Sequence, residues 1–262
     1  MGSRYELLSI ERDGALAHIV VNRPPVNAIN SALLKELHRA AEEVNNDGTT
    51  KVALLYPAGK HFGAGADIKE IEALEPGEAV DEFATMGQDA FFQIERGTVP
   101  VIALVRGFCL GGGCELAMAC HIRIADESAV FGQPEIKLGI CPGFGATQRL
   151  PQLVGRNRAY FMLLTGEQIS ARQAYEFGLV TAMAPQEEEL VAYGTRIGKM
   201  IAAYGQQALV GIRELVAYQY DLSIEQGTVR EAEEFGRLSR TEDMREGFRA
   251  FIEKRTPVFK DR

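Results

Sequence analysis

The feature that most constrains the fold is a recurring order of short apolar strands and helical segments that continues to about residue 180. Strands are predicted from alternating or continuous apolar runs bounded by Pro, Gly or Asn, at residues 15–21, 52–56, 101–105, 122–125 and 129–132. Strands that alternate with helices are typical of an α/β architecture and not of an all-helical or all-β one.

Helical spacing is clearest after the first strand. Apolar residues recur from Leu33 to Val44, Asn30 or Ser31 can cap the helix, and Asn45-Asn46-Asp47-Gly48 ends it. From about Glu187 the strand signal fades, and residues 187–255 read as helices broken at Tyr204-Gly205 and near Asp243. We therefore predict a core over 1–186 that holds the active site and a helical C-terminal oligomerisation lobe over 187–262.

Composition excludes several classes of protein. The formal net charge is −8 and no Lys/Arg run is present, so nucleic acid, including RNA, is not expected as a partner. No stretch approaches the ~20 apolar residues of a membrane-spanning helix, and the N-terminus lacks a secretory signal pattern, so a cytoplasmic protein without membrane contact is expected. An acidic protein can still bind an anionic small ligand through local cations and helix N-termini.

Cysteines and histidines show no pattern of a metal site. The cysteines have no C-x-x-C pair and are expected to be buried free thiols, and the histidines have no H-E-x-x-H pair. We therefore predict no metal ligands. The cysteines are Cys109, Cys114, Cys120 and Cys141.

Two glycine-rich segments, residues 62–69 and 107–117, combine close backbone approach with ionisable side chains. Neither matches a dinucleotide fingerprint or a P-loop. Two such loops can instead aim a pair of backbone N–H donors at one carbonyl oxygen, and the second loop leads into a helix whose N-terminus favours negative charge. The pattern indicates an oxyanion hole.

Two carboxylates accompany these loops. Glu115 lies three residues after Gly112, in the first turn of the predicted helix, where it could also serve only to stabilise the helix N-terminus. Glu135 follows Pro134 after a strand and could also be a solvated loop carboxylate. Neither residue identifies a reaction by itself.

From about Val20 to its end the chain resembles the enoyl-CoA hydratase/isomerase (crotonase) family, because several spaced segments match that family in order. The matching segments are Arg23-Pro24 with Asn27-Ala28, Phe62-Gly-Ala-Gly-Ala-Asp-Ile-Lys69, Gly107-Phe-Cys-Leu-Gly-Gly-Gly-Cys-Glu-Leu-Ala117, Phe131-Gly-Gln-Pro-Glu135, Pro142-Gly-Phe-Gly145 with Thr147-Gln-Arg-Leu150, Leu164-Thr-Gly166, Ala174 with Gly178-Leu-Val180, and Phe251-Ile-Glu-Lys-Arg255.

The resemblance implies a spiral of strand-strand-helix turns with a helical trimerisation lobe, assembled as a trimer or a dimer of trimers. It implies that the N–H groups of Ala66 and Gly112 hold a thioester oxygen, and that Glu115 and Glu135 flank the reacting carbons. Retention of both acids favours reversible hydration of a 2-enoyl-CoA over other reactions of the family. Coenzyme A, a part of the substrate and not a separate cofactor, is expected along Ala64, Ala66, Asp67, Ile68, Lys69 and Gly112, with Phe251 and Lys254 contributed from the C-terminal helix, if need be of a neighbouring subunit.

Departures from the family pattern bear on the substrate. His121 stands where relatives commonly have an acid, Ala146 replaces a frequent glycine, and Cys141 and Phe144 fall close to where the acyl chain is expected. A double-bond isomerase, a hydratase of a cyclic enoyl-CoA and a catalytically silent CoA-ester binding protein stay open as alternatives.

Overall fold

The computed structural model describes residues 4–217 and 221–262, and its centre is a six-stranded sheet with a three-stranded sheet beside it. The large sheet has the order β1-β2-β3-β4-β6-β9, in which β1 is antiparallel to β2 and the other neighbours are parallel. The predicted α/β class is confirmed. These strands span Leu8–Asp13, Leu16–Val21, Val52–Pro57, Val101–Val105, Ile122–Ala125 and Ala182–Met183.

The small sheet joins β5 (Phe108–Leu110), β7 (Val130–Gly132) and β8 (Gln168–Ser170). Strands β4 and β6 of the large sheet are each followed directly by a strand of the small one, and a helix comes next. This is the strand-strand-helix turn that was expected. The turn from β4 into β5 needs Gly107, because its φ is +55° and a Cβ there would lie 2.2 Å from the carbonyl oxygen of Lys60.

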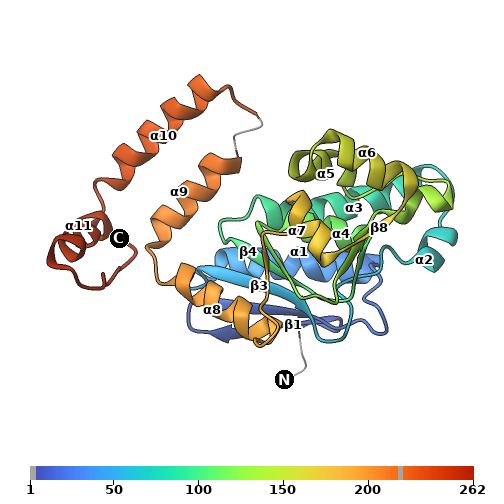
Figure 1. Cartoon of the computed structure of the whole chain (residues 1–262), viewed down its shortest axis with the longest axis horizontal. Coiled ribbons are helices and arrows are strands. Elements are labelled where there is room, and N and C mark those ends of the chain that lie inside the picture. Colours follow the sequence, from blue (N-terminus) through green and yellow to red (C-terminus); the bar gives the residue numbers. More distant parts are fainter. Residues whose placement is uncertain (1–3, 218–220) are drawn as a thin grey trace.

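Helices cover both faces of the large sheet (Figure 1). One face packs against α1, α3 and α4, and α8 (Leu190–Ala202) covers the other with apolar side chains that include Leu190 and Ile197. The Asn30 side chain caps α1, as predicted. The helices of the α/β part are α1 (Ser31–Asn46), α2 (Ile68–Glu72), α3 (Glu78–Glu95), α4 (Gly112–Ala119), the 3₁₀ helix η1 (Pro134–Leu138), α5 (Ala146–Val154), α6 (Arg156–Thr165) and α7 (Ala171–Phe177).

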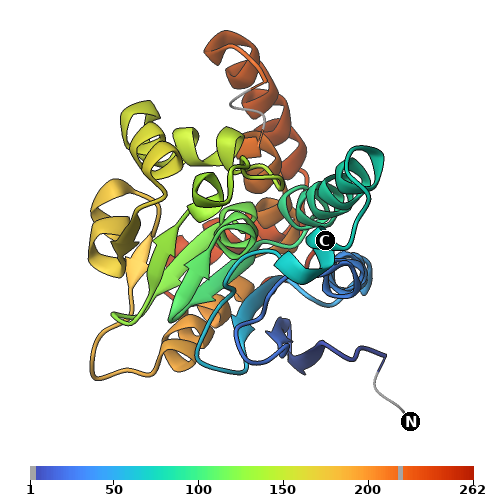
Figure 2. The ribbon, with the colours of Figure 1, turned by 90° about the vertical axis from the view of Figure 1, so that its right-hand side faces the viewer.

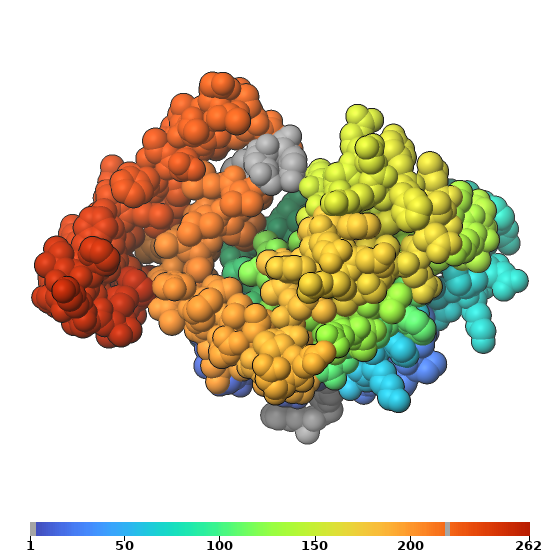
Figure 3. All heavy atoms as spheres, viewed as in Figure 1, coloured from blue at the N-terminus to red at the C-terminus, as the bar shows by residue number. Residues whose placement is uncertain are grey.

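The C-terminal part is helical, with α8 (Leu190–Ala202), α9 (Gln206–Ala217), α10 (Ile224–Leu238) and α11 (Glu242–Glu253). Breaks fall at Tyr204-Gly205 and just before Asp243, as predicted. Figure 1 shows α9, α10 and α11 projecting from the α/β body, Figure 2 shows α10 rising above the body, and Figure 3 shows α10 as an arm that stands off it. Helix α8 belongs to the predicted C-terminal lobe, because it follows residue 187, and yet it packs on the sheet of the predicted core. The division into core and lobe stays a prediction.

No helix within the described residues is long and apolar enough to span a membrane.

Candidate active site

The two glycine-rich segments lie against each other. Gly63 pairs with Cys109 as a parallel bridge, in which its N–H donates to the carbonyl of Phe108 at 2.9 Å and its carbonyl accepts from Leu110 N at 2.9 Å. A Cβ on Gly113 would lie 2.2 Å from the carbonyl oxygen of Gly63, so the contact requires glycine. The N-terminus of α4 is thereby fixed on the first loop.

The Ala66 N–H points toward α4. Ile29 forms a parallel bridge with Ala66 by donating to Gly65 O at 2.8 Å and accepting from Asp67 N at 2.7 Å. In such a bridge the middle residue directs its own N–H to the opposite side. On that side lies Gly112, where a Cβ would be 3.4 Å from Ala66 N. The geometry brings the two predicted donors together at the start of α4, where the helix dipole favours negative charge.

Glu115 is buried beside these donors, with 1% of its surface exposed. Its Oε1 accepts the backbone N–H groups of Phe144 and Ala146, both at 2.9 Å. Burial raises the pKa of Glu115 to about 7, with a further rise from the negative charge of Glu135, while the two N–H groups favour the ionised form. A carboxyl group in this state can exchange a proton near neutral pH.

Glu135 approaches the same point from η1. A Cβ on Gly111 would lie 2.6 Å from its Oε1, and Gly111 has a φ of +49°. In the amide orientation that gives both side-chain atoms of Gln133 a suitable partner, its nitrogen donates to the two carboxylate oxygens of Glu135 at 3.1 and 3.2 Å. Burial raises the pKa of Glu135. Two carboxyl groups with raised pKa values therefore flank the start of α4.

The segment that holds Glu115 is itself anchored by Arg149, a buried residue of α5. Its guanidinium donates to Phe144 O at 2.9 Å and makes a bidentate pair with Glu95 of α3, at 2.9 and 2.7 Å. Arg149 belongs to the motif Thr147-Gln-Arg-Leu150, and its role as an anchor was not predicted. The motif was a signal for importance, and the pairing with Glu95 was not visible because 54 residues separate the two.

The residues predicted to bind coenzyme A are brought together only in part. Ile68 and Lys69 are exposed at the start of α2, while the carboxylate of Asp67 is engaged by the Arg23 guanidinium at 2.6 Å, which lowers its pKa. Phe251 and Lys254 are exposed residues at the end of α11. Figure 1 shows α11 and α2 at opposite sides of the molecule, so one chain does not bring these two groups together.

Comparison with known proteins bears on this geometry. A profile of the enoyl-CoA hydratase/isomerase family matches residues 11–262. The chain belongs to this family. It is 42% identical to the crotonyl-CoA hydratase of Syntrophomonas wolfei, over 97% of this chain and 98% of the relative, and 40% identical to a probable enoyl-CoA hydratase of Bacillus subtilis, over 97% and 98%. The solved enoyl-CoA hydratase of Bacillus anthracis has a TM-score of 0.94 and 36% identity, covering 98% of this chain and 100% of that one.

The expected crotonase fold is thereby confirmed, and the departures of this family member can be located within it. Ala146 is buried and keeps the N–H contact to Glu115, so alanine serves there as glycine would. His121 lies away from the paired acids, accepts Val101 N at Nδ1, and has its pKa lowered to about 4 by burial and the charge of Arg213. Cys141 is exposed, which corrects the expectation that all four thiols are buried.

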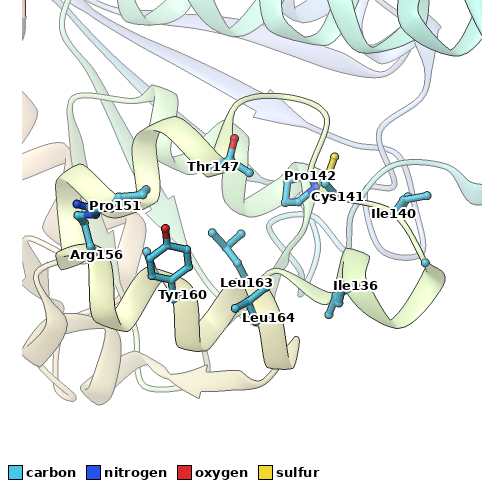
Figure 4. Close-up of a pocket in the computed structure, with 12 residues that line it drawn as sticks. Ile136, Ile140, Cys141, Pro142, Thr147, Pro151, Arg156, Tyr160, Leu163 and Leu164 are labelled. Carbon is cyan, nitrogen blue, oxygen red and sulfur yellow. The ribbon is translucent and has the colours of Figure 1, made fainter.

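An apolar pocket of about 600 Å³ lies beside Cys141, between η1, α5 and α6 (Figure 4). It is lined by the segment after Glu135, with Ile136 and Pro142, and from the other side by Tyr160 and Leu164 of α6. Among the described residues, those that line it include neither of the paired acids nor Gly112. The pocket therefore lies next to the paired acids without including them.

Metal-binding groups of three or more His, Cys, Asp or Glu side chains do not occur in the described part of this family member.

Proposed function

We propose that this protein is an enoyl-CoA hydratase, which adds water reversibly across the double bond of a 2-enoyl-CoA to give a 3-hydroxyacyl-CoA. The observation that carries the proposal is the pairing of two carboxyl groups of raised pKa, Glu115 and Glu135, beside the N-terminus of α4. The family and the names of its relatives, crotonyl-CoA hydratase among them, support the same reaction class.

In this proposal the N–H groups of Ala66 and Gly112 bind the thioester oxygen. Water attack at Cβ places negative charge on that oxygen as the thioester becomes enolate-like, and donors aimed at developing charge stabilise the transition state more than the ground state. The closeness of Gly112 to Ala66 N supports the assignment. Each donor would contribute about 3–4 kcal/mol in a dry site.

The acid pair moves two protons. Glu115 takes a proton from the attacking water, whose oxygen bonds to Cβ, and Glu135 gives its proton to Cα. Burial raises the pKa of both carboxyl groups, and the two N–H groups on Glu115 oppose that effect by favouring its ionised form. These two donors support Glu115 as the base, and Glu135 is assigned the proton that the pair shares. The pair begins and ends the step with one proton, which lies on Glu135 before the step and on Glu115 after it. Because hydration transfers no electrons, the step as proposed needs no redox cofactor, and we assign no metal to it.

Coenzyme A is placed by this proposal along Ala64 to Lys69, with Phe251 and Lys254 supplied by the α11 of a neighbouring subunit in a trimer or a dimer of trimers. The separation of α11 from α2 within one chain supports this arrangement. So does the exposure of apolar side chains on the projecting helices, which a monomer would leave in water. They include Ile224 (82% exposed), Phe235 (67%), Phe251 (85%) and Ile252 (79%).

Product analysis in ¹⁸O-labelled water tests the reaction class. Incubation of the protein with crotonyl-CoA is expected to give 3-hydroxybutyryl-CoA with one labelled oxygen on Cβ. A 3-enoyl-CoA converted to its 2-enoyl isomer without hydration would replace the hydratase by an isomerase. Tight binding of CoA esters without any turnover would identify a silent binder.

A further inference from the structure

Phe144 is buried between α3 and the start of α4, with 3% of its surface exposed. A Cβ on Gly87 of α3 would lie 2.2 Å from its ring carbon Cδ1, and a Cβ on Gly112 would lie 3.0 Å from its Cε2. The ring therefore fills the space between the two helices and leaves no room for a side chain at either glycine.

The ring is also fixed in place. Phe83 and Phe91 of α3 each pack on it with centroid separations of 5.5 Å. Its backbone is held at both ends, by the N–H donated to Glu115 and by the carbonyl that accepts from Arg149. The backbone of α3 at Gly87 leaves the ring no room to retreat toward that helix, so the ring forms a wall there.

This wall stands at the reacting centre. Gly112, whose N–H is assigned to the thioester oxygen, lies against the ring edge. Glu115, which is assigned as the base, accepts a hydrogen bond from the Phe144 backbone N–H. An acyl group placed with its Cα and Cβ between the two glutamates would meet the ring wherever it extended toward α3.

We propose that Phe144 is a specificity-determining residue that closes the acyl end of the site, so that the protein prefers short 2-enoyl-CoA thioesters such as crotonyl-CoA. The inference rests on the proposed hydratase function. A short acyl group ends before the ring, whereas a longer one needs the volume that the ring occupies. The apolar pocket beside Cys141 is the other place a long chain could reach, and the experiment distinguishes the two.

The test measures kcat/KM for crotonyl-CoA and for 2-octenoyl-CoA. The wild type is expected to prefer crotonyl-CoA, and Phe144→Ala, which keeps both backbone contacts, is expected to raise the octenoyl-to-crotonyl ratio by at least about tenfold. Phe144→Leu gives an intermediate ratio and serves if the alanine variant does not fold. Phe91→Ala is the matched control, because it removes an equal ring from the same cluster without opening the space beside Gly112, and its ratio stays at the wild-type value.

The inference would be overturned if the wild type hydrated 2-octenoyl-CoA as efficiently as crotonyl-CoA. The acyl chain would then be assigned to the pocket beside Cys141. A ratio that changes equally in Phe144→Ala and Phe91→Ala would also overturn it, since loosened packing then explains both. In either case the hydratase function stands. If neither substrate were hydrated, the proposed function itself would be contradicted.

Discussion

At the residue scale the site depends on a buried carboxyl group, Glu115, on which opposing influences act: some favour its protonated form and others its ionised form. Burial and Glu135 raise its pKa, and two N–H donors lower it. Sequence analysis could select Glu115 because it lies one helical turn after Gly112. It could not supply the donors Phe144 and Ala146, which lie 29 and 31 residues further along the chain and reach Glu115 only through the fold.

The raised pKa of Glu115 predicts an unusual pH dependence of stability. Because its pKa rises from 4.5 in the unfolded chain to about 7 in the folded one, its stabilising contribution is fully present below pH 4.5 and is lost as the pH rises through about 7. Glu115→Gln is always neutral, so it should exceed the wild type in free energy of unfolding by about 3 kcal/mol at pH 8 and match it near pH 4.

Chemical denaturation of both proteins at equal concentration across this pH range measures the difference. A difference that is independent of pH would show that the Glu115 pKa is not raised.

At the element scale the site is the junction of two loops that carry glycine for steric reasons. The glycine-rich segments were predictable as loops of close approach, and their contact is confirmed. What sequence could not give is which glycine is essential. Gly113 meets backbone atoms of Gly63, whereas a Cβ on Gly59 would meet nothing within 4 Å. Likewise β1 escaped sequence analysis, because its exposed outer half gives little apolar signal and it is defined by its antiparallel pairing with β2.

Gly113→Ala should separate the two oxyanion donors. Its methyl group would overlap the carbonyl of Gly63, and backbone cannot yield as a side chain can, so α4 must shift away from Ala66. We expect kcat for crotonyl-CoA to fall by about 10²–10³, the size of a lost oxyanion donor, with a smaller change in KM. Gly59→Ala is the matched control in the preceding loop. Equal activities of the two variants would contradict the described junction.

At the scale of the whole molecule the projecting helices α9 to α11 leave large apolar side chains exposed to water. Their helical character and the break at Tyr204-Gly205 were predictable from composition and turn residues. The packing of α8 on the sheet was not, because an amphipathic helix does not reveal which apolar surface it covers. Its glycine face fits closely there, since a Cβ on Gly194 would lie 2.5 Å from Leu104 of β4.

Assembly is predicted to complete the site. Sedimentation should find the wild type as a trimer or a multiple of it, and Phe251→Asp should weaken assembly and raise KM for crotonyl-CoA by about tenfold or more, because charge in an apolar contact is costly. Tyr175→Asp, a change of an exposed aromatic residue on α7, is the control and should leave both properties unchanged. A fully active monomer would contradict the assigned role of α11.

The central claim is that Glu115 and Glu135 together hydrate the double bond, and initial rates of loss of the enoyl-thioester absorbance of crotonyl-CoA test it most directly. Glu115→Gln and Glu135→Gln should each lower kcat by at least about 100-fold, and the double variant should lose much less than the product of the two, because the acids act as a unit. Glu75→Gln, an exposed carboxylate, should behave as the wild type. Near wild-type turnover by either of the first two variants would contradict the paired-acid mechanism.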